Sequence, residues 1–223
     1  MFKRIYSRVF ASALLVGAVA GVQAATVSWT DWTAASPGSV AGALDVNGTA
    51  VGVTFSGVYG FAQTAAGTNY WNPSTPYLSG VVSNAPPAPD IIALSAGGTV
   101  TVSFSQAVAD PLIALVSWNS NTVDFGEPIE VLSFGAGYWG NGTPVVNVQG
   151  TGFFGSGEVH GVIRLAGEHT SITFTHTSEN WHGLTVGVVG LGTTPPIPEP
   201  ETYALMLAGL AAMSLVVRRR RAV

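Results

Sequence analysis

Glu127 and Glu130 are two carboxylates close enough in sequence to face one groove. Glycoside cleavage needs two acids about 5–9.5 Å apart across the scissile bond. Pro128 lies between them and interrupts any regular segment, so a turn on an acidic surface also accounts for the pair. The pair by itself does not predict an enzyme.

Other residues with reactive side chains lack the spacing that catalysis requires. The four histidines match no familiar zinc-ligand pattern: His160, His169, His176 and His182. Glu158 and His160 would share one face of a strand, which is a common arrangement. Gly155-Ser156-Gly157 lacks the spacing of a nucleophile elbow and indicates a turn. We predict no catalytic residue.

Oxygen-bearing side chains gather between residues 119 and 127. Asn119, Asn121, Asp124 and Glu127 could contribute to a calcium site, since calcium takes about six to eight oxygen ligands. The spacing is not that of an EF-hand, and Asn-rich turns also form for conformational reasons. Calcium is the one candidate cofactor, and both interpretations stay open.

Aromatic residues give the stronger indication of a ligand. Two adjacent pairs stand in Asn- and Gly-rich stretches predicted to be loops: Tyr70 with Trp71, and Tyr138 with Trp139. Flat aromatic faces stack on sugar rings, so we predict that these four residues contact carbohydrate. Trp118 and Trp181 flank apolar strands and are predicted to fill the core.

The elements that must position these residues are strands. Apolar residues alternate with polar ones at Val51–Phe55, Val100–Phe104, Ile172–Phe174 and Leu184–Val188, which predicts strands with one buried and one wet face. Pro111–Trp118 is a denser apolar run, typical of a central strand covered on both sides. Turn signals such as Asn47-Gly48 recur, and no amphipathic helix is evident. We predict an all-β, antiparallel β-sandwich that is jelly-roll-like.

Composition and charge exclude one class of partner. The chain has no cysteine. Between residues 25 and 194 it carries ten acidic residues and a single base, Arg164, a net charge of −9. Such a domain repels phosphate backbones, so we predict no nucleic-acid partner.

The N-terminus is typical of an export signal. Lys3, Arg4 and Arg8 precede an apolar run at Val9–Ala20, and small residues before Ala25 suit cleavage. This predicts a signal peptide at 1–24, followed by a β-sandwich domain at 25–192.

The C-terminus combines three signals. Residues 193–201 form a Pro-rich linker that contains Pro198, Glu199 and Pro200. Sixteen uncharged residues follow, Thr202–Val217, about 24 Å as a helix against a hydrocarbon core of about 30 Å. A basic stop then follows: Arg218, Arg219, Arg220 and Arg221. Residues 202–223 are thus predicted to be a marginal transmembrane helix with its arginines in the cytoplasm.

This tail resembles the PEP-CTERM sorting domain of Gram-negative bacteria, which exosortases recognise. The resemblance implies an exosortase partner, a transient inner-membrane anchor cleaved near the motif, and delivery to the cell surface or outside the cell. Residues 99–188 also resemble bodies often found upstream of such tails, which implies an exported β domain and no reaction.

Two functions remain from the sequence and the resemblance, and a third possibility, a membrane-anchored protein with a structural body, differs from the first only in that its tail is not removed. The first is a non-enzymatic, exported surface or extracellular-matrix protein, for which the resemblance implies an association with exopolysaccharide or biofilm. The second is a secreted polysaccharide-acting enzyme on a jelly-roll scaffold, which would need an acid pair in an aromatic-lined cleft.

Overall fold

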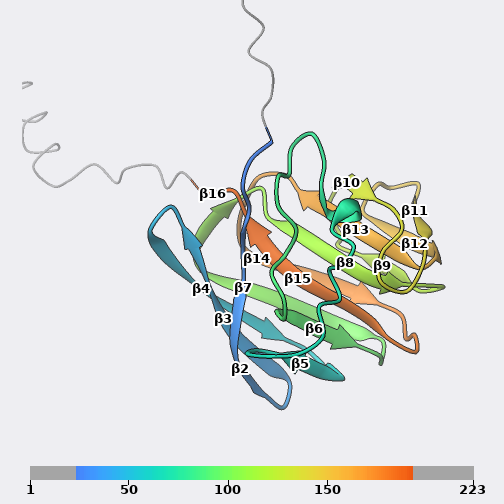
Figure 1. Cartoon of the computed structure of the whole chain (residues 1–223), viewed down its shortest axis with the longest axis horizontal. Coiled ribbons are helices and arrows are strands. Elements are labelled where there is room, and N and C mark those ends of the chain that lie inside the picture. The colour runs from blue at the N-terminus through green and yellow to red at the C-terminus, as the bar shows by residue number, and fades with distance from the viewer. Residues whose placement is uncertain (1–23, 193–223) are drawn as a thin grey trace, which may run out of the picture.

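The structure is a computed structural model that describes residues 24–192. These residues form two antiparallel sheets packed face to face (Figure 1), which confirms the predicted all-β sandwich. The predicted linker, membrane segment and all but the last residue of the signal peptide lie outside the described range. Within that range, no helix is long and apolar enough to cross a membrane.

The first sheet has seven strands. Their order is β10 (Ile129–Phe134), β13 (Val159–Leu165), β8 (Leu112–Trp118), β15 (His182–Val188), β6 (Ile91–Leu94) and β5 (Phe61–Gln63), with β1 (Ser28–Trp29) paired to β15.

The second sheet has nine strands. Their order is β11 (Gly142–Val146), β12 (Gly152–Gly157), β9 (Thr122–Asp124), β14 (Glu168–His176), β7 (Gly98–Ala109), β4 (Thr49–Ser56), β3 (Ser39–Val46) and β2 (Asp31–Ser36), with β16 (Gly190–Leu191) paired to β7.

Strand β4 shows how the alternating pattern produces a half-buried strand. Val51, Val53 and Phe55 are buried, while the residues between them are exposed. Asn47 and Gly48 both have positive φ (53° and 85°) and join β3 to β4 directly. This backbone matches the right-handed twist of a hairpin, which explains the Asn-Gly signal.

The two central strands of the first sheet are buried on both faces. All seven residues of β8 are buried, as its dense apolar run predicts. The prediction of a wet face for β15 is wrong, because all seven of its residues are buried as well. Thr185 is satisfied there by the indole N–H of Trp32, at 3.0 Å, and a side chain at Gly187 would collide with Trp29.

Two apolar clusters result. The larger lies between the sheets and includes Ile113, Leu115 and Trp118. The smaller lies on the outer face of the first sheet, where the long segment from 64 to 90 crosses it (Figure 1). That segment contributes Trp71, together with Tyr77 of the short 3₁₀ helix η1 (Thr75–Tyr77).

Candidate functional site

A cleft of about 620 Å³ opens at the end of the first sheet where β8 ends and β15 begins. Five separate segments of the chain line it: Tyr70; Ser117, Asn119 and Ser120; Trp139; Glu158; and Glu179, Asn180 and Trp181. Aromatic rings and carboxylates therefore meet in one cavity, a combination typical of a site for a polar ligand with apolar faces.

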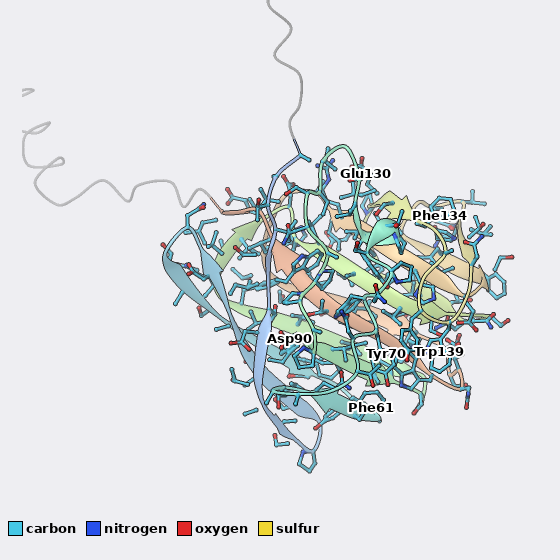
Figure 2. The ribbon with its side chains drawn as sticks, viewed as in Figure 1. Phe61, Tyr70, Asp90, Glu130, Phe134 and Trp139 are labelled. Carbon is cyan, nitrogen blue, oxygen red and sulfur yellow. The ribbon has the colours of Figure 1, made fainter. Side chains whose placement is uncertain are left out.

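The aromatic side of the cleft is a continuous chain of ring contacts. Tyr70 lies 5.0 Å from Trp181 and 5.1 Å from Tyr138 between ring centroids, and Tyr138 lies 5.0 Å from Trp139. Phe61 stacks on Trp181 behind them at 5.9 Å, with 28° between the ring planes. Figure 2 shows Phe61, Tyr70 and Trp139 gathered in one region of the molecule. Trp139 is 56% exposed and Tyr138 is 40% exposed, so the outer end of this chain is open to solvent.

The loop that carries Tyr138 and Trp139 is held tightly against β13. The N–H of Gly137 donates to the carbonyl of Gly140 at 2.8 Å and closes the loop. A Cβ on Gly137 would lie 2.2 Å from the ring of His160, so only glycine allows this approach. The exposed aromatic pair is therefore presented on a fixed support.

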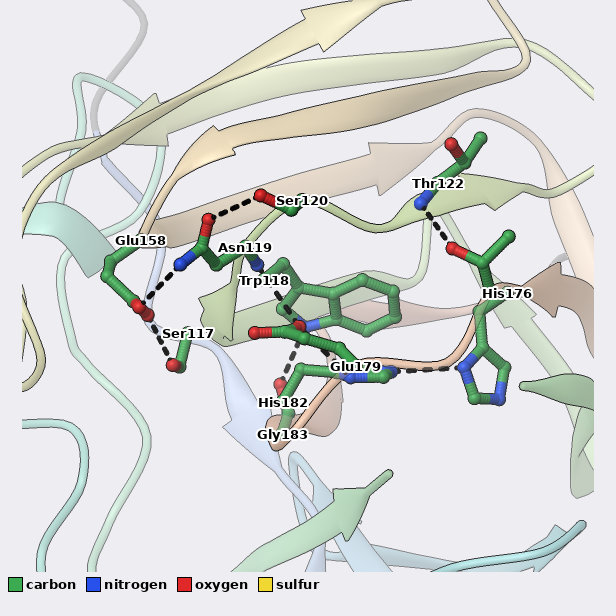
Figure 3. Close-up of polar contacts among 11 residues, drawn as sticks. Ser117, Trp118, Asn119, Ser120, Thr122, Glu158, His176, Glu179, His182 and Gly183 are labelled. Atoms are coloured by element: carbon green, nitrogen blue, oxygen red, sulfur yellow. Dashed lines mark hydrogen bonds and ion pairs between the residues drawn. The ribbon is translucent and has the colours of Figure 1, made fainter. Parts of the chain in front are cut away.

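The opposite side of the cleft holds two carboxylates joined through Asn119 (Figure 3). The backbone N–H of Asn119 donates to Oε2 of Glu179 at 3.1 Å, and its side-chain amide donates to Oε1 of Glu158 at 2.8 Å. The hydroxyl of Ser117 donates to Oε2 of Glu158. Both acids therefore accept hydrogen bonds from the same residue, Asn119.

A β-bulge in β8 produces this geometry. Trp118 pairs with Val159, but Leu115 pairs with Gly161, so β8 holds one residue more than β13 between these pairs. Ser117 takes up the extra residue with φ of 58°. The bulge turns the Ser117 hydroxyl to Glu158 and sends Trp118 into the inter-sheet core, where simple alternation would have placed it with Val116 on the outer face.

The two carboxylates differ in environment. The side chain of Glu179 is only 12% exposed, and its burial raises its pKa to about 7, with a further increase from the negative charge of Glu158. The N–H of Asn119 opposes this shift without cancelling it. Glu179 is therefore partly protonated at neutral pH, the state that a proton donor requires.

Two histidines lie behind Glu179. Nδ1 of His182 is 3.2 Å from Oε2 of Glu179, and its Nε2 is 3.0 Å from Nδ1 of His176. Burial lowers the pKa of both imidazoles to about 4. Both are neutral at pH 7, so neither supplies a positive charge that would keep Glu179 ionised.

The structure divides the four residues predicted to contact carbohydrate. Tyr70, Tyr138 and Trp139 come together from distant segments, and Tyr70 and Trp139 line the cleft. Trp71 lies elsewhere: it is 2% exposed and packs edge-on against Tyr77 in the outer cluster, so it offers no free face for stacking. Trp181, predicted to be core, is partly exposed and lines the cleft in its place.

The residues predicted for calcium have separate contacts. Asn119 donates hydrogen bonds to Glu158 and Glu179, while Asn121 is fully buried. Asp124 accepts the N–H of Gly126 at 2.8 Å, and Glu127 lies 3.7 Å from His169. Within residues 24–192, no three His, Asp or Glu side chains form a metal-binding group. Calcium binding by this stretch stays a prediction.

Glu127 and Glu130, the two acids that lie close together in sequence, do not line the cleft. Glu130 faces Arg164 across β10 and β13 and receives its hydrogen bond, while Glu127 lies near His169. Sequence reasoning missed the Glu158–Glu179 pair because 20 residues separate them and no motif joins them. The local signal for Glu179 is Trp181, two positions further along the chain.

Comparison with known proteins identifies the tail. A family model of the PEP-CTERM protein-sorting motif matches residues 196–221, which include Pro198–Pro200 and Arg218–Arg221. This confirms the resemblance and implies a protein that an exosortase sorts to the cell surface. No curated protein and no solved structure matches the chain.

Proposed function

We propose that this protein is an exported cell-surface or matrix protein whose β-sandwich binds a neutral exopolysaccharide in the cleft. The sorting motif accounts for export, recognition by an exosortase and surface targeting. A temporary inner-membrane anchor at residues 202–223 belongs to the same proposal. The single observation that carries the binding function is the ring chain from Trp181 through Tyr70 and Tyr138 to Trp139, beside polar groups.

The cleft suits a chain of neutral sugars. Sugar rings have apolar faces that stack on tryptophan and tyrosine, and hydroxyl groups that bind carboxylates and amides. Glu158, Glu179 and Asn119 supply such acceptors and donors next to the rings. The cleft lining contains no lysine or arginine, so a polyanionic polysaccharide would be repelled.

The position of the cleft also suits a surface protein. Trp181 immediately precedes β15, and the described chain ends at Gly192, just beyond the other end of that strand. Seven residues of strand span about 23 Å. A tail leaving at Gly192 would therefore hold the sandwich with the cleft on the side away from the anchor.

Strand order supports the finer part of the fold proposal, a jelly roll. From β6 to β9 consecutive strands alternate between the sheets, and β13, β14 and β15 do the same. The resulting orders, β6-β15-β8-β13 and β7-β14-β9-β12, are those of two interlocked Greek keys. Many sugar-binding domains use this architecture.

Binding can be tested with the full-length chain in a detergent without a sugar headgroup. Tryptophan fluorescence is followed during titration with cellohexaose, laminarihexaose and xylohexaose, with alginate as the polyanionic control. We expect saturable binding of a neutral hexasaccharide, at least tenfold weakened by Trp139→Ala.

Phe134→Ala is the matched control, because Phe134 is 50% exposed, close to the 56% of Trp139, but does not line the cleft. It should bind like the parent protein. Equal affinities of the parent and Trp139→Ala proteins, or no binding of any neutral hexasaccharide, would overturn the proposal.

A further inference from the structure

We propose that the cleft hydrolyses glycosidic bonds of the polysaccharide that it binds, with Glu179 as general acid and Glu158 as general base; this inference rests on the proposed function. The geometry that carries it is a pair of carboxylates facing one cavity beside an aromatic platform. Such a pair is the arrangement that the sequence alone did not reveal.

The carboxylates are held in fixed positions by the same turn. Asn119 donates one hydrogen bond to each acid, and Ser117 donates a second one to Glu158. The backbone N–H of Glu179 is itself bound to the carbonyl of Ser95 at 3.0 Å. A bulged strand, a turn and an anchored segment therefore position both groups before any ligand arrives, as catalysis requires.

Their environments assign the two roles. The side chain of Glu179 is only 12% exposed, with Nδ1 of neutral His182 3.2 Å from its Oε2 and the carboxylate of Glu158 as its charged neighbour in the cleft. Burial raises its pKa to about 7, so it can carry the proton that a leaving oxygen needs. Glu158 accepts hydrogen bonds on both oxygens, which leaves further lone pairs to take a proton from water.

The reaction balances as a single displacement. Glu158 takes a proton from water while the water oxygen bonds to the anomeric carbon. The bond from that carbon to the glycosidic oxygen breaks, and its electron pair stays on the oxygen, which receives the proton of Glu179. The products are two shorter sugar chains, and solvent returns the proton from Glu158 to Glu179.

Charge favours hydrolysis over elimination. Elimination requires a uronic acid, whose carboxylate must be neutralised in the site. Arg164 is the only lysine or arginine in residues 24–192, and it lies at the far end of β13 from Glu158. The two residues are six positions apart, about 20 Å along a strand. A neutral glycan is therefore the substrate class.

The test measures cleavage and binding on the same protein. Full-length protein in a sugar-free detergent is incubated with the three neutral hexasaccharides in H₂¹⁸O. The masses of the products are measured by mass spectrometry. We expect one ¹⁸O atom at the new reducing end for each cut. Glu179→Gln and Glu158→Gln should each slow cleavage at least about 100-fold while hexasaccharide binding persists.

Glu130→Gln is the control for loss of a carboxylate outside the cleft and should cleave at the parental rate. Binding without cleavage, or parental rates in either cleft variant, would overturn the hydrolysis inference and leave the binding function in place. Absence of both binding and cleavage would overturn both proposals. Loss of folding in one cleft variant leaves the other as an independent test.

Discussion

The two faces of the seven-stranded sheet are buried by different means. On β8, Ile113 and Leu115 point inward and pack against the nine-stranded sheet. Leu112, Ala114 and Val116 point outward and are covered by the segment that carries Trp71 and Tyr77. The inner face is sheet against sheet, whereas the outer face is sheet against an irregular segment.

This difference separates the fold from the site. The inner face needs only the alternation of apolar residues in strands, which the sequence states directly. The outer face depends on an irregular segment, and that segment also brings Tyr70 to the cleft. The cleft is thus assembled where the covering of the outer face meets the ends of the strands.

The largest effect is expected from the inner face. Trp118 is 1% exposed, contacts Phe153, Phe174 and His182, and donates its indole N–H to the carbonyl of Gly183 at 2.9 Å. Trp118→Ala should lower the free energy of unfolding by about 3–5 kcal/mol, measured by urea denaturation. A loss below about 1 kcal/mol would mean that the inter-sheet core does not determine stability.

Trp71 and Trp139, both predicted from the sequence to contact carbohydrate, give the sharpest contrast between core and cleft. Trp71→Ala should cost about 3 kcal/mol because it empties the outer cluster, whereas Trp139→Ala should stay within about 0.5 kcal/mol of the parent. Thermal and urea unfolding of both variants measure this. The reverse order would show that the loop of Trp139, and not the outer covering, supports the fold.

Acid should destabilise both faces through buried neutral histidines. His160 lies 3.4 Å from the hydroxyl of Tyr77 on the outer side, while His176 and His182 contact Trp118 on the inner side. Burial lowers the pKa of each to about 4, below the usual 6.5, so the unfolded chain binds more protons between these values. Their contribution is present above pH 6.5 and is lost as pH falls toward 4.

Between pH 7.5 and 5.5 each histidine should therefore remove about 1 kcal/mol of stability. Urea denaturation at the two pH values measures the total, and His160→Gln and His176→Gln should each reduce it. Equal pH dependence in the parent and both variants would contradict neutral burial of these rings.

Glu179 should act in the opposite direction. Its folded pKa of about 7 lies above its usual 4.5, so its contribution to stability is full below 4.5 and is lost as pH rises through 7. Glu179→Gln removes this opposing group. At pH 8 we expect a higher free energy of unfolding for the variant than for the parent. On acidification the variant should lose more of this free energy than the parent does. Parallel pH curves for the two proteins would show that Glu179 is not perturbed by the cleft.

The sequence predicts what depends on local pattern. Alternation identified Val51–Phe55 as a half-buried strand, the dense run identified β8, and Asn47-Gly48 identified a hairpin. It was wrong on β15, whose second face is covered by residues distant in sequence, including Trp29.

The cleft was only partly predictable for the same reason. The loop composition around Tyr70, Tyr138 and Trp139 predicts exposed aromatic rings, but it does not tell which ring of an adjacent pair faces inward. Trp71 took the core position and Trp181 the cleft position. Glu158 and Glu179 are linked through hydrogen bonds from Ser117 and Asn119 at the bulged end of β8, and no local residue pattern predicts these contacts.

The smallest effect is expected at the edge of the seven-stranded sheet, where β10 carries Glu130. Glu130 and Arg164 lie directly opposite each other on β10 and β13, with side chains 55% and 34% exposed. An exposed pair of this kind is screened by water and salt, so Glu130→Gln should cost no more than about 0.5 kcal/mol, and nothing measurable near 1 M salt. Urea denaturation at low and high salt measures it, and a salt-independent loss above about 2 kcal/mol would contradict a screened surface pair. Glu130→Gln removes an exposed carboxylate that lies outside the cleft. If its effect is small, a loss of cleavage in the Glu158 and Glu179 variants is specific to the cleft.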